Sequence, residues 1–196
     1  MRRERESMMS YQQWRDRPVR GQAYKGLLAG LLGGFVACWA MNQWLALWQR
    51  VVEGETATRR GQPVVGQGGQ LTQEAPDERQ PPTMHAAAAL AHRLFRYVPT
   101  DCEKQQGGQA LHYTFGTATG ALYGSLTEAF PVLSTAAGIP FGMVVWLLAD
   151  EIAVPVLGLS KPPAQQKRST HLYAFAAHCI YGLTTECTRR LVRRYW

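Results

Sequence analysis

An uncharged stretch near the start of the chain sets the first constraint on the fold. Residues 26–49 read GLLAGLLGGFVACWAMNQWLALWQ, with no charged side chain among them. About 20 apolar residues cross the hydrocarbon of a bilayer, whereas about 10–14 are typical of a core helix. The stretch therefore predicts a membrane-spanning helix over 24–49. Trp44 and Trp48 near its end favour the level of the headgroups.

The segment in front of this helix, residues 1–23, is polar and rich in arginine. Such a composition predicts a flexible, basic N-terminal segment. No small-residue cleavage site follows the apolar stretch, so we expect an uncleaved signal anchor and not a secretory signal peptide.

Three further apolar blocks occupy residues 108–130, 137–157 and 170–191. Their uncharged cores are shorter or more polar than the first block. Together the four blocks predict an all-α fold, an integral membrane bundle of four transmembrane helices within residues 24–191. A short basic tail, 192–196, follows the last block.

A long segment, 50–107, separates the first two spans, and its first part is rich in Gln, Gly, Pro, Glu and Thr, which predicts a loop. Later in this segment, residues 83–98 have high helix propensity and carry Leu90, Leu94 and Phe95 on one side. We expect an amphipathic helix there that lies along the membrane surface or packs on the bundle.

Four spans place both termini on one side of the membrane. Basic residues gather before the first span and after the last one, whereas segment 50–104 carries as many acidic as basic residues. The positive-inside rule therefore favours the cytoplasm for both termini. The formal net charge of +7 does not indicate nucleic-acid binding. The basic residues flank spans, where the lipid bilayer and its anionic headgroups are the expected partners.

The glycines of the first two spans recur every four residues. Four residues advance a helix by about 400°, so each set forms a stripe on one side of its helix. We expect both stripes to be helix-packing faces, because small residues let backbones approach closely in lipid. The alternative is that glycine is simply common in membrane helices. The sequence does not decide whether the chain forms a homo-oligomer. The stripes consist of Gly26, Gly30 and Gly34 in the first span, and Gly116, Gly120 and Gly124 in the second.

A short motif, Tyr-Gly-x-x-Thr-Glu, occurs twice, at 123–128 and at 181–186. The sequence AGIPFG in the third block loosely resembles YKGLLAG in the first through Gly138 and Gly142. These similarities favour a two-helix unit that is used twice, with a long insertion in the first copy.

Two adjacent carboxylates, Asp150 and Glu151, lie near the middle of the third block. A carboxylate at mid-helix costs about 2.5–3.5 kcal/mol on insertion scales, so this helix should need partners. In an antiparallel hairpin with the fourth block, His178 comes to the depth of Asp150. We therefore predict that His178 hydrogen-bonds or pairs with Asp150, or with Glu151. Pro155 lacks an N–H, which frees the Glu151 carbonyl and permits a kink there.

The glutamates of the repeated motif, Glu128 and Glu186, come near the cytoplasmic ends of helices that run in the same direction. Glu186 precedes Arg189 and Arg190 by three and four residues, which is the spacing of ion pairs on one helix face. We expect each copy to end in a carboxylate that meets basic residues or its twin.

Three interpretations of these polar groups stay open. They hold helices together in a non-enzymatic assembly module, they form a proton or ion route, or they serve an enzyme embedded in the bilayer. The sequence contains no Ser-His-Asp order, HExxH or zinc spacing, and VVGQGGQ lacks nucleotide-binding spacing, so we expect no catalytic motif, cofactor or metal site. A soluble helical protein would have to bury the whole first block. The candidate intramembrane polar network is His112, Glu128, Asp150, Glu151, His178 and Glu186.

Several of these residues also carry a resemblance to a known family. Residues 112–190 resemble the YagU-like bacterial inner-membrane proteins, a domain family of unknown function. The resemblance implies a multi-pass protein of the bacterial inner membrane and supplies no activity. The matching elements are His112 with Phe115 and Tyr123, EAFP at 128–131, PVLGLSKPP at 155–163, His178, Glu186, and RR at 189–190.

Overall fold

The structure is a computed structural model that describes residues 19–60, 81–160, 162–166 and 168–196. These residues form helices and no strand, which confirms the all-α class for the described part of the chain. The longer helices are α2 (Val19–Arg60), α3 (Pro82–Phe95), α4 (Asp101–Ala129) and α7 (Arg168–Arg194). Shorter helical elements follow α4 through the third apolar block: η2 (Pro131–Gly138), α5 (Ile139–Trp146), η3 (Leu147–Ala153) and α6 (Val154–Val156). One more short element, η4 (Pro163–Gln165), precedes α7.

Two helical stretches within the described ranges are long and apolar enough to cross a bilayer. They are Ala23–Val51 and Pro131–Val156, which correspond to the first and third predicted spans. Helices α4 and α7 are long enough to cross a bilayer, roughly 40 Å each at about 1.5 Å per residue. Their residues are more polar, however, so they do not meet the requirement of an apolar composition. Length and composition thus support two of the four predicted spans.

The helices extend beyond several predicted boundaries. Most of the flexible segment predicted over 1–23 lies outside the described residues, but 19–23 belong to α2. Helix α2 also continues through 51–60, where a loop was expected. The Glu, Ala and Arg residues of this part are good helix formers. Residues 192–194 of the expected basic tail are the last residues of α7.

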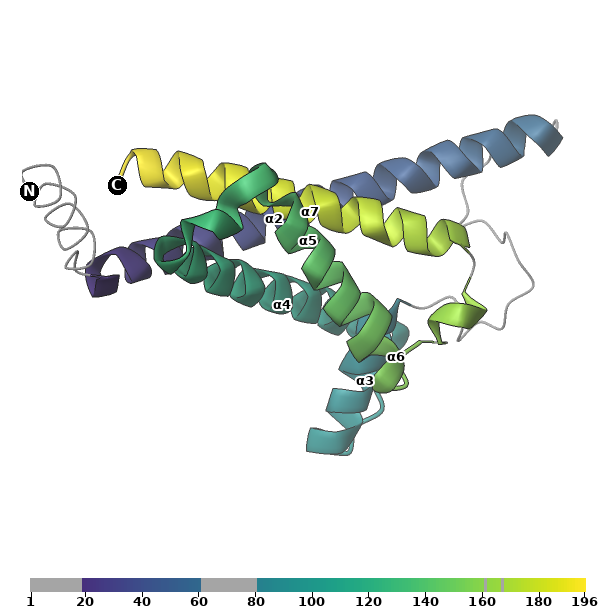
Figure 1. Cartoon of the computed structure of the whole chain (residues 1–196). Helices are drawn as coiled ribbons and strands as arrows, with labels where there is room; N and C mark the ends of the chain where they lie inside the picture. The colour runs from purple at the N-terminus through teal and green to yellow at the C-terminus, as the bar shows by residue number, and fades with distance from the viewer. Residues whose placement is uncertain (1–18, 61–80, 161, 167) are drawn as a thin grey trace, which may run out of the picture.

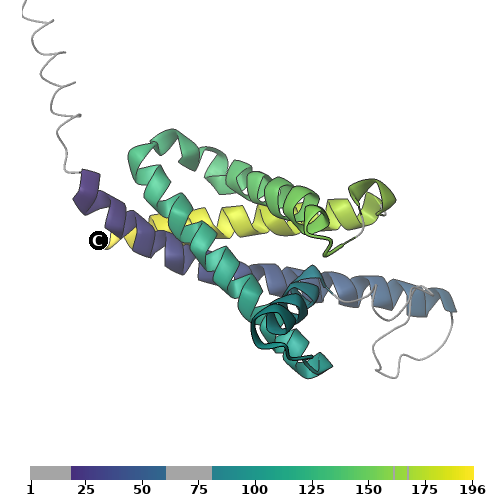
Figure 2. The ribbon, with the colours of Figure 1, turned by 90° about the horizontal axis from the view of Figure 1, so that it is seen from below.

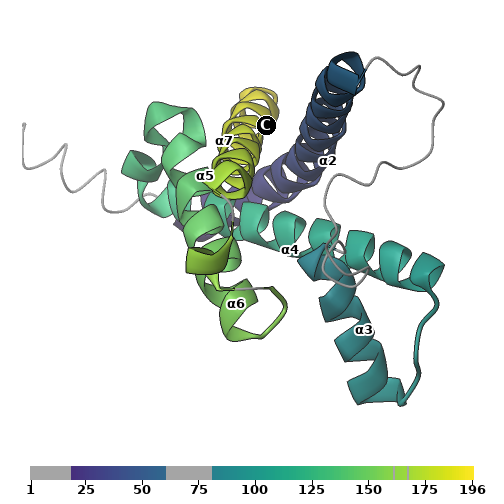
Figure 3. The ribbon, with the colours of Figure 1, turned by 90° about the vertical axis from the view of Figure 1, so that its right-hand side faces the viewer.

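The long helices pack as a bundle around α2. Helix α7 runs beside α2, and α4 crosses α2 on another side (Figures 1 and 2). Helix α5 packs on α7. Helix α3 contacts α4 and points away from the bundle, across the direction of α2 and α7 (Figures 1 and 3).

Small side chains fill the centre of this bundle, and large apolar side chains point outward. Ala29, Ala37 and Cys38 of α2 are fully buried, whereas Phe35 and Trp39 of the same helix are 53% and 56% exposed. This distribution is the reverse of a water-soluble core, where large apolar residues are buried. It is typical of helices that associate in lipid through small residues.

The two glycine stripes meet where α2 crosses α4. A Cβ atom on Gly120 would lie 2.6 Å from the carbonyl oxygen of Gly30 and 2.7 Å from Cα of Gly34. A Cβ atom on Gly124 would lie 2.8 Å from Cα of Gly30. These contacts are with backbone atoms, so the close approach of α2 and α4 requires glycine at these positions.

The second hairpin repeats this contact pattern. A Cβ atom on Gly182 of α7 would lie 2.7 Å from the nitrogen of Gly142 and would also meet the carbonyl oxygen of Gly138. Gly124 of α4 meets Gly26 and Gly30 in the same way. Gly182 follows Gly124 by 58 residues, and the α5 glycines follow those of α2 by 112. The contacts therefore relate the α5–α7 hairpin to the α2–α4 hairpin, as a duplicated unit predicts.

Helix α4 begins seven residues before the predicted span because Thr100 and Glu103 form a capping box. The Glu103 N–H donates to Thr100 Oγ1 at 3.4 Å, and the Thr100 N–H donates to Glu103 Oε2 at 2.7 Å. Tyr97 Oη also donates to Glu103 Oε2, at 2.7 Å. These hydrogen bonds hold the pKa of Glu103 below its usual range, and the one from the Thr100 backbone has the largest effect.

Loss of this capping box should unwind the first turn of α4. Because the folded-state pKa of Glu103 is lowered, its stabilising effect is present above the ordinary carboxyl pKa and is lost as pH falls through the folded value. We expect Thr100→Ala at neutral pH, and acid pH in the wild type, to reduce the amide protection of the first turn. Hydrogen–deuterium exchange measures both, and equal protection in Thr100→Ala and wild type would contradict this assignment.

Candidate functional site

Two acid–histidine pairs connect the third apolar block to α7. Asp150 Oδ2 lies 3.7 Å from His178 Nδ1, close to the position predicted from equal depth in an antiparallel hairpin. This distance is longer than a hydrogen bond, and His178 Nδ1 lies 2.9 Å from the carbonyl oxygen of Ala174, its hydrogen-bond partner. Glu151 Oε1 lies 2.6 Å from His171 Nδ1. The side chains of His178 and Glu151 are 9% and 15% exposed, whereas those of their partners Asp150 and His171 are 38% and 25% exposed, so each pair has one buried and one partly exposed member.

The ring of His171 lies between two hydrogen-bond acceptors. Its Nδ1 faces Glu151, and its Nε2 lies 3.0 Å from the carbonyl oxygen of Pro163. A neutral imidazole carries one N–H only, so it cannot donate to both. The arrangement needs one further proton, held by the imidazole or by the Glu151 carboxyl. His171 and Glu151 are therefore arranged to share a proton.

The two acids lie on a π-helical turn, η3 (Leu147–Ala153). The Val154 N–H donates to the carbonyl oxygen of Ala149, five residues back. Pro155 cannot donate to the Glu151 carbonyl, so the α-helical hydrogen-bond pattern would be broken here in any case. Single π-helical turns occur frequently at functional sites.

The first hairpin has no counterpart of these pairs. With the offset of 112 residues that relates the glycines of the two hairpins, Asp150 and Glu151 correspond to Cys38 and Trp39 of α2. His178 stands where α4 has Gly120, and His171 where α4 has Tyr113. The first hairpin thus achieves the same glycine contacts without an acid or a histidine at these positions. The pairs are additional to what holds such a hairpin together.

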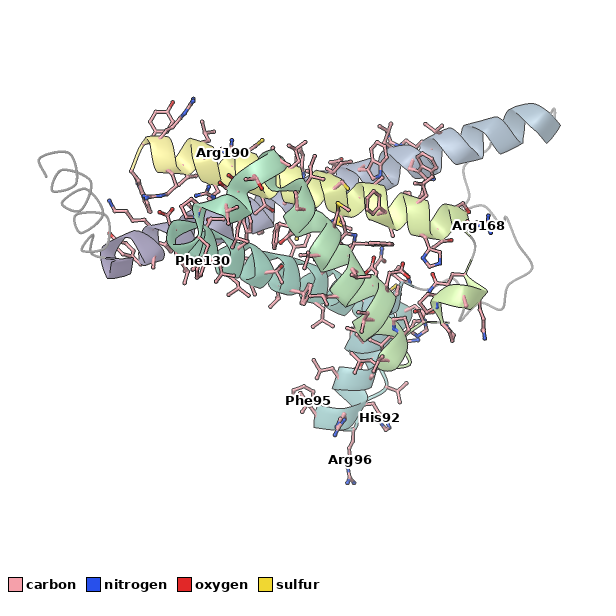
Figure 4. The ribbon with its side chains drawn as sticks, in the orientation of Figure 1. His92, Phe95, Arg96, Phe130, Arg168 and Arg190 are labelled. Atoms are coloured by element: carbon pink, nitrogen blue, oxygen red, sulfur yellow. The ribbon has the colours of Figure 1, made fainter. Side chains whose placement is uncertain are left out.

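A second polar cluster lies at the opposite end of the bundle. Glu186 is fully buried, and its carboxylate accepts from Arg189 Nε at 2.7 Å and from Arg190 Nε at 2.6 Å. Glu128 accepts from Arg193 Nε at 2.9 Å and from Arg189 Nη1 at 3.4 Å. Arg189 therefore bridges the glutamates of the two repeated motifs. Figure 4 shows Arg190 and Phe130 at this end and Arg168 at the other.

His112 takes part in neither cluster. Its Nε2 is buried and has no hydrogen-bond partner among the described residues, and its ring meets that of Tyr113 edge to face. Its carbonyl oxygen accepts from Cys38 Sγ at 3.7 Å.

The six residues predicted as one network thus occupy separate places. Asp150, Glu151 and His178 lie at one cluster, and Glu128 and Glu186 at the other. His112 forms no side-chain hydrogen bond with either, although it lies within electrostatic range of His178. About eight residues of α7, or about 12 Å, separate His178 from Glu186. The sequence reasoning missed His171, although His171 and His178 differ by seven residues and so share a face of α7.

The chemistry available at the acid–histidine pairs is proton exchange. Carboxyl and imidazole groups in contact can take up, pass on and release a proton without moving the backbone. The described residues contain no group of three or more His, Cys, Asp or Glu side chains that could hold a metal ion.

Comparison with known proteins gives a family for most of this region. Residues 72–187 match the family described as "Protein of unknown function (DUF1440)". No curated protein and no solved structure matches the chain. The match begins before the region of the YagU-like resemblance, includes α3, and contains both acid–histidine pairs and both glutamates of the repeated motif. An uncharacterised family agrees with that resemblance, while the YagU-like identity stays a prediction. The match covers more than half of the chain, which therefore belongs to the DUF1440 family of proteins of unknown function.

Proposed function

We propose that this protein is a multi-pass protein of the bacterial inner membrane that binds and passes protons through its acid–histidine pairs. The observation that carries the proposal is the presence of two such pairs in the second hairpin, at positions where the similarly packed first hairpin has none. A purely structural hairpin of this kind does not need them. The proton that His171 and Glu151 must share supports the same function.

The membrane location has its own support. In the most apolar 18-residue window of Pro131–Val156, only 11% is buried inside the protein, whereas the core helix of a soluble protein would be mostly buried. Helices α4 and α7 complete four spans in the proposal, with their polar groups turned toward other helices. Both termini then lie in the cytoplasm, beside the basic residues that flank the first and last spans.

A non-enzymatic assembly module is the second candidate. The glycine contacts and the Glu–Arg cluster favour it, because each connects helices without any chemistry. In that case the acid–histidine pairs would be polar contacts between helices and nothing more.

Proton flux in reconstituted vesicles distinguishes these candidates. We expect wild-type protein to carry protons above the leak of protein-free vesicles. We expect Asp150→Asn and His178→Ala to lower that flux to the leak, because each removes one member of a pair. The flux is measured with a pH-sensitive dye trapped in the vesicles, and circular dichroism checks that each variant is folded.

Glu103→Gln is the matched control, because it removes a carboxylate at the exposed start of α4. Glu128→Gln and Glu186→Gln, provided that they fold, test whether the second cluster belongs to the same route. No flux above the leak in folded wild type would reject proton handling and leave the assembly module.

A further inference from the structure

Helix α3 leaves the bundle after its first turns. A Cβ atom on Gly108 of α4 would lie 3.1 Å from Cγ of Met84, and one on Gly107 would lie 3.0 Å from Cβ of Ala87. Beyond this crossing α3 continues away from α4, across the direction of α2 and α7 (Figures 1 and 3). None of its residues is buried.

The apolar side of α3 continues past the point where α4 covers it. Leu90, Leu94 and Phe95 follow Met84 and Ala87 on this side and are 46%, 63% and 76% exposed. Three large apolar side chains on one free helix end require an apolar environment that the described residues do not supply.

The opposite side of the same helix end is basic. His92, Arg93 and Arg96 line a shallow open pocket at the tip of α3. The helix ends at Arg96, which adopts the left-handed conformation at φ 51°. Figure 4 shows Phe95 and His92 on opposite sides of the tip of α3. Phe95 faces the same end of the bundle at which Phe130 lies.

The crossing of α3 and α4 fixes the height of α3 along the bundle. Gly108 lies less than two turns from Tyr113, whose hydroxyl accepts from Asn42 Nδ2 at 3.4 Å. Trp44 and Trp48 follow Asn42 within two turns, and tryptophan favours the boundary between headgroups and acyl chains. Helix α3 thus leaves the bundle close to the predicted membrane surface and runs across the direction of the helices that span the membrane.

We propose that α3 lies in the headgroup layer of the membrane and binds anionic phospholipid. Leu90, Leu94 and Phe95 enter the acyl chains, while His92, Arg93 and Arg96 meet lipid phosphates. An amphipathic helix with this division of residues binds at the plane of the interface. The long arginine side chains reach the phosphates while their methylene groups stay near apolar surface. This inference rests on the proposed membrane location.

Spin labels at three positions of the full chain in lipid nanodiscs test the depth of α3. The labelled cysteines replace Phe35, His92 and Phe95, one at a time. The background keeps the fully buried Cys38 and carries Cys102→Ala, Cys179→Ala and Cys187→Ala, which break no disulfide because all four cysteines are free. Label collisions with oxygen report the hydrocarbon, and collisions with a water-soluble nickel chelate report water.

We expect the labels at 35 and 95 to be open to oxygen and closed to nickel, and the label at 92 to be open to nickel. If the label at 35 is in hydrocarbon while that at 95 is open to nickel, the inference about α3 is wrong and the membrane location stands. If the label at 35 is open to nickel as well, the membrane location fails first. Spin–spin coupling between labels at 95 in different copies would assign the apolar side to a second copy and overturn the lipid assignment.

The anionic character of the lipid is tested by amide exchange of 82–95. We expect slower exchange in nanodiscs with phosphatidylglycerol than in pure phosphatidylcholine. Each arginine near an anionic surface contributes about 5-fold to the docking equilibrium, so Arg93→Gln with Arg96→Gln should remove about 25-fold. Arg168→Gln, at the same end of the bundle but on α7, is the matched control. Equal exchange in both lipids would reject the binding of anionic phospholipid.

Discussion

Gly120→Leu is expected to separate α2 from α4 and to abolish most of the folded population. The new Cβ atom would lie 2.6 Å from a carbonyl oxygen of Gly30 and 2.7 Å from Cα of Gly34. Backbone atoms cannot move aside as a flexible side chain can, so the helices must part. The cost should be at or above the upper end of the about 1–3 kcal/mol that an overpacked core loses. The free energy of unfolding in mixed detergent micelles, followed by circular dichroism, measures it.

Ala118→Leu is the matched control for this prediction. Ala118 lies two residues earlier on the exposed side of α4, so leucine there adds the same atoms without meeting α2. We expect a small change in its free energy of unfolding. Equal losses in the two variants would mean that the glycine stripe does not set the distance between the helices.

Glu186→Gln should produce the second large loss of stability. The carboxylate is fully buried and accepts from both Arg189 and Arg190, and its removal leaves the 11% exposed Arg189 side chain without its main counter-charge. Breaking a buried ion pair by neutralising one partner costs about 3–5 kcal/mol. The same unfolding measurement gives the value, and Asp101→Asn, at a side chain that is 82% exposed, serves as the control on the protein surface.

A double variant shows whether the loss comes from the unpaired arginine. Glu186→Leu combined with Arg189→Leu should be more stable than Glu186→Leu alone, because the isolated charge is then absent. A double variant less stable than the single one would show that Arg189 stabilises the protein mainly through Glu128.

The strongest sequence signals located the helices but not all of their ends. The uncharged run of 26–49 identified the apolar part of α2, because it lacks charges over a length that lipid requires. The ends depended on local chemistry that hydropathy does not report. Thr100 and Glu103 start α4 in a polar stretch, and α2 continues to Arg60 although its hydropathy falls after residue 51.

Part of the candidate site followed from helix geometry. Equal depth in an antiparallel hairpin placed His178 against Asp150, and the spacing of three and four residues placed Arg189 and Arg190 against Glu186. The pairing of Glu151 with His171 did not follow, because the equal-depth argument selected His178 for either acid, and His171 lies seven residues, or about two turns, before it on α7. Nothing in the local sequence except Pro155 indicates the π-helical turn on which the two acids lie.

The π-helical turn also makes one part of the third block tolerant of a change in chain length. A π-helical turn holds one residue more than the α-helical turn that would replace it. Deletion of Ala153 could therefore be absorbed as an ordinary α-helical turn. The helix would stay continuous and the segments on either side would keep their relative orientation, because the residue removed is the extra one of the π-helical turn, while the residues within the turn would change direction. A relative with a one-residue gap at this place would keep its helix and lose the orientation of its acids toward α7.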